Sequence, residues 1–209
     1  MSRYYEHRPL SADPNPKILT SRSVRRRSGI GSEYWDFRIA DINNASYRDT
    51  ILKYVKSLHT HPRGTGLFFW GPVGTGKTSM ASCVLKHVLA RGGRVLSVRC
   101  SVAIDRLCSK NPGLAPDDVP FQDALLGIQY LLLDDFRMPA ESWKKQSIEN
   151  VIASRCDDRL PTLITANIDS RSDFESMRET LPWLWSRLTQ RFVVVNVNGI
   201  DQRPANRGN

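Results

Sequence analysis

A glycine-rich stretch, Gly71-Pro72-Val73-Gly74-Thr75-Gly76-Lys77-Thr78, follows directly on the apolar run Leu67–Trp70. The pattern G-x-x-x-x-G-K-T is a phosphate loop, whose backbone N–H groups point at phosphates while the next helix adds the positive end of its dipole. Lys77 is placed to reach the β and γ phosphates, and the Thr78 hydroxyl is a candidate ligand of Mg²⁺. A glycine turn that binds nothing is the alternative, but the required strand, loop and helix context is complete. We therefore expect a site for ATP and Mg²⁺.

Alternating strand and helix patterns indicate an α/β fold: a three-layer P-loop structure with a parallel five-stranded sheet and helices on both faces. Apolar residues recur with helical spacing between the phosphate loop and Gly92, where the glycine pair ends that helix. Residues 111–126 interrupt the pattern with three prolines. Strands are expected at 67–70, 94–99, 130–133, 161–166 and 192–197, and further helices at 45–58, 101–110, 141–158 and 181–190.

The charge of the chain indicates a polyanionic partner. Its 209 residues carry a net charge of +9, and neutralising phosphates drives nucleic-acid binding. Residues 1–30 hold seven Arg or Lys against two acidic residues, including the cluster Arg25-Arg26-Arg27. Because this stretch also contains three prolines and few apolar residues, we expect a flexible basic N-terminal arm.

The cellular context follows from what the sequence lacks. The four cysteines form no C-x-x-C pair, so we expect reduced thiols rather than a metal site. No apolar stretch approaches the roughly 20 residues that cross a bilayer, and the N-terminus has no secretory-signal pattern. An Arg- and Ser-rich start resembles an organelle transit peptide, but Glu6, Asp13 and the prolines argue against one. We expect a cytoplasmic protein with no membrane partner.

Two acidic residues follow the apolar run Leu131-Leu132-Leu133. Ligands of open α/β sheets collect at the carboxyl ends of the strands, so Asp134 and Asp135 form a candidate Walker B element. Asp134 would hold Mg²⁺ through water, and Asp135 would orient or deprotonate the attacking water. A solvated Asp-Asp turn is the alternative.

Asn167 ends the next expected strand, Thr162 to Asn167. From a neighbouring strand tip its amide could hydrogen-bond the attacking water or the γ phosphate. A turn-forming asparagine is the alternative.

Taken together, these motifs resemble the AAA+ ATPases, and within them the DnaC/IstB group of helicase loaders and transposition ATPases. The resemblance covers about Gly29 to Arg203 and rests on G-P-V-G-T-G-K-T, L-L-L-D-D-F, T-A-N, W-S-R-L and V-N-G-I-D-Q-R. It implies an ATPase domain over residues 31–200, a short tail over 201–209, and a lid domain that is reduced or absent.

The resemblance also assigns two arginines and a DNA-binding region. The arginine that matches Arg187 is a finger that enters a neighbouring active site, which implies a homo-oligomeric ring or spiral; a solvated helix arginine is the alternative. The one that matches Arg203 senses the γ phosphate. Single-stranded DNA lies along helices that match residues 101–129, with Arg106 and Lys110 as basic candidates and Phe121 as a stacking surface.

The resemblance favours an ATP-dependent loader of a replicative helicase. An IstB-like ATPase that remodels target DNA and activates a transposase is the neighbouring alternative. Two further hypotheses come from other classes: a P-loop kinase of a small metabolite, and a DNA-binding adaptor that binds ATP without hydrolysing it.

Overall fold

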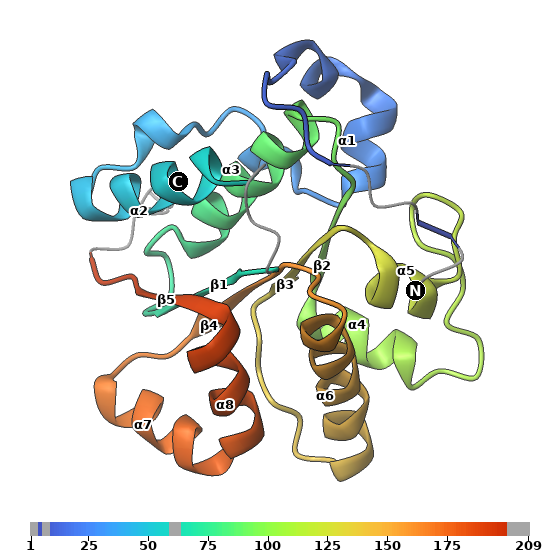
Figure 1. Cartoon of the computed structure of the whole chain (residues 1–209). Helices are drawn as coiled ribbons and strands as arrows, with labels where there is room; N and C mark the ends of the chain where they lie inside the picture. Colours follow the sequence, from blue (N-terminus) through green and yellow to red (C-terminus); the bar gives the residue numbers. More distant parts are fainter. Residues whose placement is uncertain (1–3, 6–8, 59–63, 200–209) are drawn as a thin grey trace, which may run out of the picture.

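Five parallel strands form the middle layer of the computed structural model, which describes residues 4–5, 9–58 and 64–199 (Figure 1). Their order across the sheet is β2-β3-β4-β1-β5. The α/β, three-layer P-loop fold with a parallel five-stranded sheet is thereby confirmed. The strands are β1 (Gly66–Gly71), β2 (Val95–Arg99), β3 (Tyr130–Asp134), β4 (Thr162–Asn167) and β5 (Phe192–Asn196).

Helices cover both faces of this sheet (Figure 1). Side chains of the inner strands alternate between the two faces: Phe68 and Leu133 pack with α4 to α8, whereas Leu67 and Leu132 pack with α2 and α3. Because both faces are buried, β1 and β3 are continuous apolar runs. The helices are α2 (Ala45–Lys56), α3 (Lys77–Ala90), α4 (Cys100–Leu107), α5 (Phe121–Gly127), α6 (Ser142–Asp157), α7 (Arg171–Thr180) and α8 (Pro182–Arg191).

The N-terminal segment differs from the flexible arm expected over residues 1–30. From residue 9 onward it forms η1 (Pro16–Thr20) and α1 (Arg22–Ser28), followed by η2 (Ser32–Tyr34) and η3 (Ile39–Asp41). Leu10 and Ile30 are buried in the layer that contains α3. The N–H groups of Ser11 and Asn15 donate to the carbonyls of Arg91 and Ala90, which lie at the end of α3. Helix ends leave carbonyls without partners, and this segment satisfies two of them.

The segment between β2 and β3 corrects two DNA-binding expectations. Phe121 is only 1% exposed, so it offers no stacking surface. The Arg106 guanidinium lies 3.6 Å from the centre of the Phe121 ring and donates to the carbonyl oxygens of Pro112 and Leu114. Both side chains therefore stabilise the turn between α4 and α5. Lys110 is exposed.

Two expectations concern residues after β5. Arg203 and the short tail 201–209 lie outside the described residues. A lid that followed β5 would begin in the same undescribed segment. Within the described part, no helix combines the length and the apolar character needed to cross a bilayer.

Candidate nucleotide-binding site

The phosphate loop joins β1 to α3 and depends on glycine at three positions. Gly71, Gly74 and Gly76 have φ angles of 149°, 82° and 90°, which side chains with a Cβ rarely adopt. A Cβ on Gly71 would also lie 2.0 Å from the carbonyl oxygen of Val197, the residue after β5. The loop is therefore closed against the sheet, and α3 begins at Lys77.

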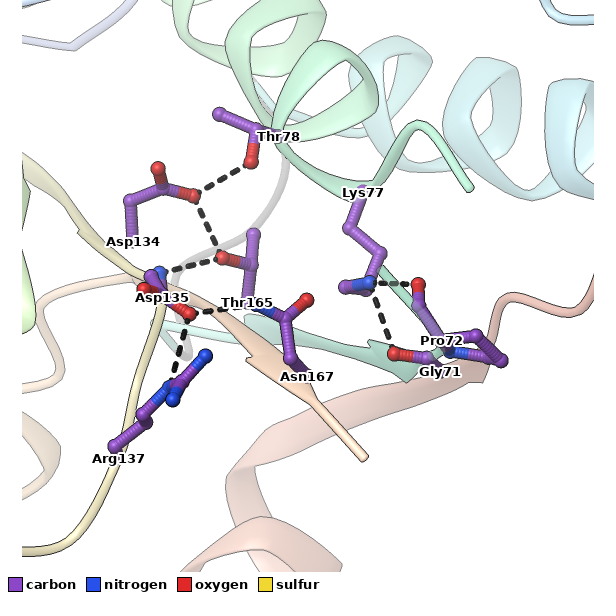
Figure 2. A network of polar contacts seen from close by, with 9 residues as sticks. All are labelled: Gly71, Pro72, Lys77, Thr78, Asp134, Asp135, Arg137, Thr165 and Asn167. Atoms are coloured by element: carbon purple, nitrogen blue, oxygen red, sulfur yellow. Dashed lines mark hydrogen bonds and ion pairs between the residues drawn. The ribbon is translucent and has the colours of Figure 1, made fainter. Parts of the chain in front are cut away.

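The Lys77 side chain is folded back onto this loop. Its Nζ donates to the carbonyl oxygens of Gly71 at 2.9 Å and Pro72 at 2.5 Å, and the residue is 5% exposed (Figure 2). A second loop contact runs from the Thr75 hydroxyl to the Pro72 carbonyl at 2.9 Å. The ammonium group is thus held at the loop by carbonyl oxygens, ligands that phosphate oxygens can replace.

Asp134 lies beside Thr78 at the carboxyl end of β3. Its Oδ1 accepts a hydrogen bond from the Thr78 hydroxyl at 2.8 Å and another from the Thr165 hydroxyl at 2.6 Å (Figure 2). Thr165 belongs to β4, which the sheet order places between β3 and β1. The two residues expected at Mg²⁺ are therefore in contact, although 56 positions separate them in the sequence.

Asp135 occupies a strained turn that directs its carboxylate toward β4. Its φ of 52° is uncommon for a residue with a side chain. Such a conformation costs about 1–3 kcal/mol, which surrounding contacts must offset. The turn is held by its N–H, which donates to the Thr165 hydroxyl at 2.9 Å. Its Oδ1 accepts from Asn167 Nδ2 at 2.6 Å and lies 3.5 Å from Arg137 Nε (Figure 2). Asp135 and Asn167 thus form one polar pair.

These residues surround a cleft of about 660 Å³. Besides Ser79, the direct neighbour of Thr78, sequence reasoning missed four of its lining residues: Glu33, Tyr34 and Phe37 from the N-terminal segment, and Arg99 from the end of β2. Arg99 pairs in register with Asp134, and this neighbouring strand end is the signal that points to it. For the other three, no local pattern links residues 33–37 to the phosphate loop.

Lys86 of α3 anchors the segment that carries Tyr34. Its Nζ donates to the carbonyls of Tyr34, Trp35 and Phe37, and burial lowers its pKa. Tyr34 lines the cleft together with Thr78, and burial raises the pKa of its phenol. The N-terminal segment therefore forms part of the cleft wall above the phosphate loop.

A second pocket of about 380 Å³ adjoins the loop and shares Phe37 and Gly76 with the cleft. Apolar and amide side chains line it, a combination suited to a flat heterocycle with hydrogen-bonding edges. Its side-chain lining includes Ile42, Asn43, Asn44, Tyr47, Met80 and Asn198.

Arg187 is not brought to this site within its own chain. It is half-buried on α8, its Nη1 lies 3.4 Å from the Trp183 carbonyl, and its charge acts on Cys156 of α6. It does not line the cleft of its own chain. The finger role therefore stays a prediction that requires a second subunit.

The donor set fits Mg²⁺. No group of three or more His, Cys, Asp or Glu side chains among the described residues could hold a metal ion. The Thr78 hydroxyl and the Asp134 carboxylate are hard oxygen ligands, and Mg²⁺ keeps several waters and phosphate oxygens in addition to one or two protein ligands.

The fold is a P-loop α/β core of the AAA+ type, with polar residues gathered at the carboxyl ends of its strands. No protein-family model and no curated protein matches the sequence. Solved structures do match. The DnaC helicase loader is 22% identical with a TM-score of 0.67, and the match covers 80% of this chain and all of that one.

Two further solved structures share the fold. DnaI is 18% identical with a TM-score of 0.64, covering 80% of this chain and 94% of that one. The replication initiator DnaA, bound to AMPPCP and single-stranded DNA, is 14% identical with a TM-score of 0.59, covering 82% of this chain and 51% of that one.

Proposed function

We propose that this protein is an ATP-hydrolysing loader of a replicative DNA helicase. The observation that carries the proposal is the 2.8 Å contact between Thr78 Oγ1 and Asp134 Oδ1, which unites the phosphate loop with the acidic strand end. The likeness to a helicase loader supports the role, and the likeness to an initiator that binds AMPPCP and single-stranded DNA supports the ligands.

In this proposal, different residues bind the base, the phosphates and Mg²⁺. The pocket beside Phe37 receives the base, and the loop amides receive the phosphates. Lys77 exchanges the carbonyls of Gly71 and Pro72 for phosphate oxygens. Thr78 and Asp134 hold Mg²⁺, which when bound neutralises charge on the phosphates.

Asp135 and Asn167 orient the attacking water. The Asn167 amide donates to the Asp135 carboxylate, so both side chains face the same space at the cleft edge. Because phosphoryl transfer depends on positioning and charge, this pair needs only to hold the water in line with the γ phosphate. The donor that completes charge neutralisation would be Arg187 from an adjacent subunit of a ring or spiral.

The test is ATP hydrolysis with and without single-stranded DNA by the wild type, Lys77→Ala and Asp135→Asn, with Lys56→Ala as a control on the exposed side of α2. We expect DNA to raise the wild-type rate, both site variants to lose at least about 100-fold, and Lys56→Ala to match the wild type. Transfer of phosphate to a small acceptor, or slow hydrolysis that DNA does not raise, would contradict the proposal.

The loader role further requires co-purification with a hexameric helicase. Retention of a DNA-integrating recombinase instead would reject that role.

A further inference from the structure

The exposed side of α1 consists of arginine and serine. Arg22, Arg26 and Arg27 are exposed, and no described carboxylate lies within ion-pair distance of them. Arg25 differs, because its Nε donates to the Leu19 carbonyl at 2.9 Å and its guanidinium lies 4.8 Å from the centre of the Trp35 ring. Within the described residues, none of the four arginines of this helix pairs with a carboxylate, and Arg25 is the one held by other groups.

The arginines of the last turn lie at the favourable end of the helix dipole, but they do not anchor α1 to the rest of the protein. Arg22 and Arg26 are four residues apart on a helix, where like charges repel. The helix is held instead by its inner side: Ser28 is 1% exposed, and Val24 is partly buried against the core. At its end, Gly29 has a left-handed φ of 68° and approaches the backbone of β2 so closely that a Cβ would lie 2.2 Å from the Ser97 carbonyl oxygen. The exposed arginines therefore lie on a helix that packs closely against the rest of the protein.

The patch continues beyond α1. Arg27 and Arg94, which follows α3, line the same cavity of about 290 Å³ at the β2 edge of the sheet. Asp117 also lines this cavity and accepts a hydrogen bond from the Tyr5 hydroxyl at 2.7 Å. Lys17 of η1 is exposed nearby in the sequence. Among the residues that line this cavity, the two arginines outnumber the one carboxylate.

The chemistry of this surface fits phosphates rather than a protein. Arginine and serine are among the side chains that contact phosphate oxygens in nucleic-acid complexes. Protein interfaces need buried apolar or aromatic anchors, and α1 exposes none. Its inner side rests on β2 and its arginines lie on the outer side, where a flexible single strand can bend its phosphates to a short patch.

We propose that α1 binds the phosphodiester backbone of single-stranded DNA through Arg22, Arg26 and Arg27. This rests on the proposed function for the choice of DNA, and it moves the predicted contact from the segment between β2 and β3 to the N-terminal segment. Contacts of this kind hold the strand without reading its sequence.

The experiment measures binding of a labelled oligothymidylate to the full chain by fluorescence anisotropy, between about 50 and 200 mM salt. The test variant is Arg22→Gln/Arg26→Gln. The control is Lys53→Gln/Lys56→Gln, which removes two equally exposed charges from α2. Unchanged melting of both variants establishes that they fold.

We expect the arginine variant to bind at least about tenfold more weakly at low salt. The slope of log affinity against log salt concentration should become shallower by about 1.4, since each lost phosphate contact on a single strand removes about 0.7 from it. The lysine variant should keep the wild-type affinity and slope. Equal binding by the two variants would overturn the proposal, as would a duplex that binds more tightly than the single strand with the same arginine dependence. ATP hydrolysis without DNA distinguishes failure of the α1 inference from failure of the proposed function. If the arginine variant still hydrolyses ATP and binds DNA normally, only the α1 inference fails.

Discussion

Thr165 contacts both aspartates at the carboxyl end of β3, the side chain of one and the backbone of the other. Its hydroxyl donates to Asp134 at 2.6 Å and accepts from the Asp135 N–H at 2.9 Å. It is 2% exposed, so water cannot take its place. Thr165 is therefore a positioning residue for the site, acting through the two aspartates.

Thr165→Val removes these two hydrogen bonds at nearly constant shape. Hydrogen bonds to charged groups are worth about 1.5–3 kcal/mol, so we expect the rate of ATP hydrolysis to fall roughly 10- to 100-fold, with nucleotide affinity changed far less. Steady-state kinetics and equilibrium binding of a nucleotide analogue measure the two effects. Thr165→Ser should recover most of the rate, and a Val variant with wild-type turnover would show that the contacts are dispensable.

Arg155 joins three elements at the base of the sheet. Its guanidinium is fully buried and donates to Thr162 Oγ1 of β4, to the carbonyls of Leu125 and Ile128 around the end of α5, and to Pro161. Burial lowers the pKa of Arg155 to about 9, so the group is still charged at neutral pH. One α6 side chain thus donates hydrogen bonds to carbonyls of two other segments.

Arg155→Met should lower the free energy of unfolding by about 3–5 kcal/mol, because several buried acceptors lose their donor at once. Urea unfolding measures this. The matched control is Arg171→Met, which removes an exposed arginine paired with Glu175 and should cost less than about 1 kcal/mol. Similar losses in the two variants would contradict the structural role of Arg155.

Helix α3 carries a histidine whose pKa lies below its ordinary value. His87 is partly buried, its Nδ1 lies 2.9 Å from the Cys83 carbonyl, and desolvation lowers its pKa from 6.5. Between the folded and the ordinary pKa, the unfolded chain binds the proton more readily than the folded one. The contribution of neutral His87 to the free energy of unfolding is therefore fully present above pH 6.5 and is lost as the pH falls toward the folded-state pKa.

We expect the unfolding free energy of the wild type to decrease from about pH 7.5 to about pH 5.5. In His87→Gln this decrease should be smaller, since the titrating group is gone. Urea titrations at matched pH values test the difference. Parallel curves for the two proteins would assign the acid sensitivity to other groups.

At the scale of the whole molecule, the sheet order assembles the site. β4 lies between β1 and β3, so Asn167 pairs in register with Gly71 while Thr165 reaches both aspartates. Arg187, on α8, stays outside the cleft of its own chain. The predicted finger role of Arg187 therefore requires that a second subunit supply it to the cleft.

Mixing two inactive variants tests this arrangement. Arg187→Ala keeps an intact phosphate loop and Lys77→Ala keeps an intact Arg187, so a mixed assembly contains some complete sites. Each variant alone should lose activity, by about 10³-fold or more for an arginine finger. An equal mixture should recover roughly a quarter of the wild-type rate if subunits assemble at random. No recovery, or an Arg187→Ala variant that is fully active alone, would contradict a finger acting between subunits.

Much of this architecture could be predicted because it depends on local patterns. The five strands were predicted within two residues of their observed bounds, since buried parallel strands are continuous apolar runs. α7 was not predicted, because its Arg- and Glu-rich sequence buries only Phe174. α5 was expected only as a short segment, and the order of residues 9–30 was missed because the apolar residues that anchor them are few and scattered.

Glycine spacing and apolar periodicity act over a few residues, so the phosphate loop, the acidic strand end and the alternation of strands and helices follow from local patterns. The contacts of Thr165 with two aspartates, the burial of Arg155 and the place of residues 33–37 in the cleft wall arise from the packing of the folded chain. Those outcomes depend on which distant segments the sheet order and the burial of apolar surface bring together.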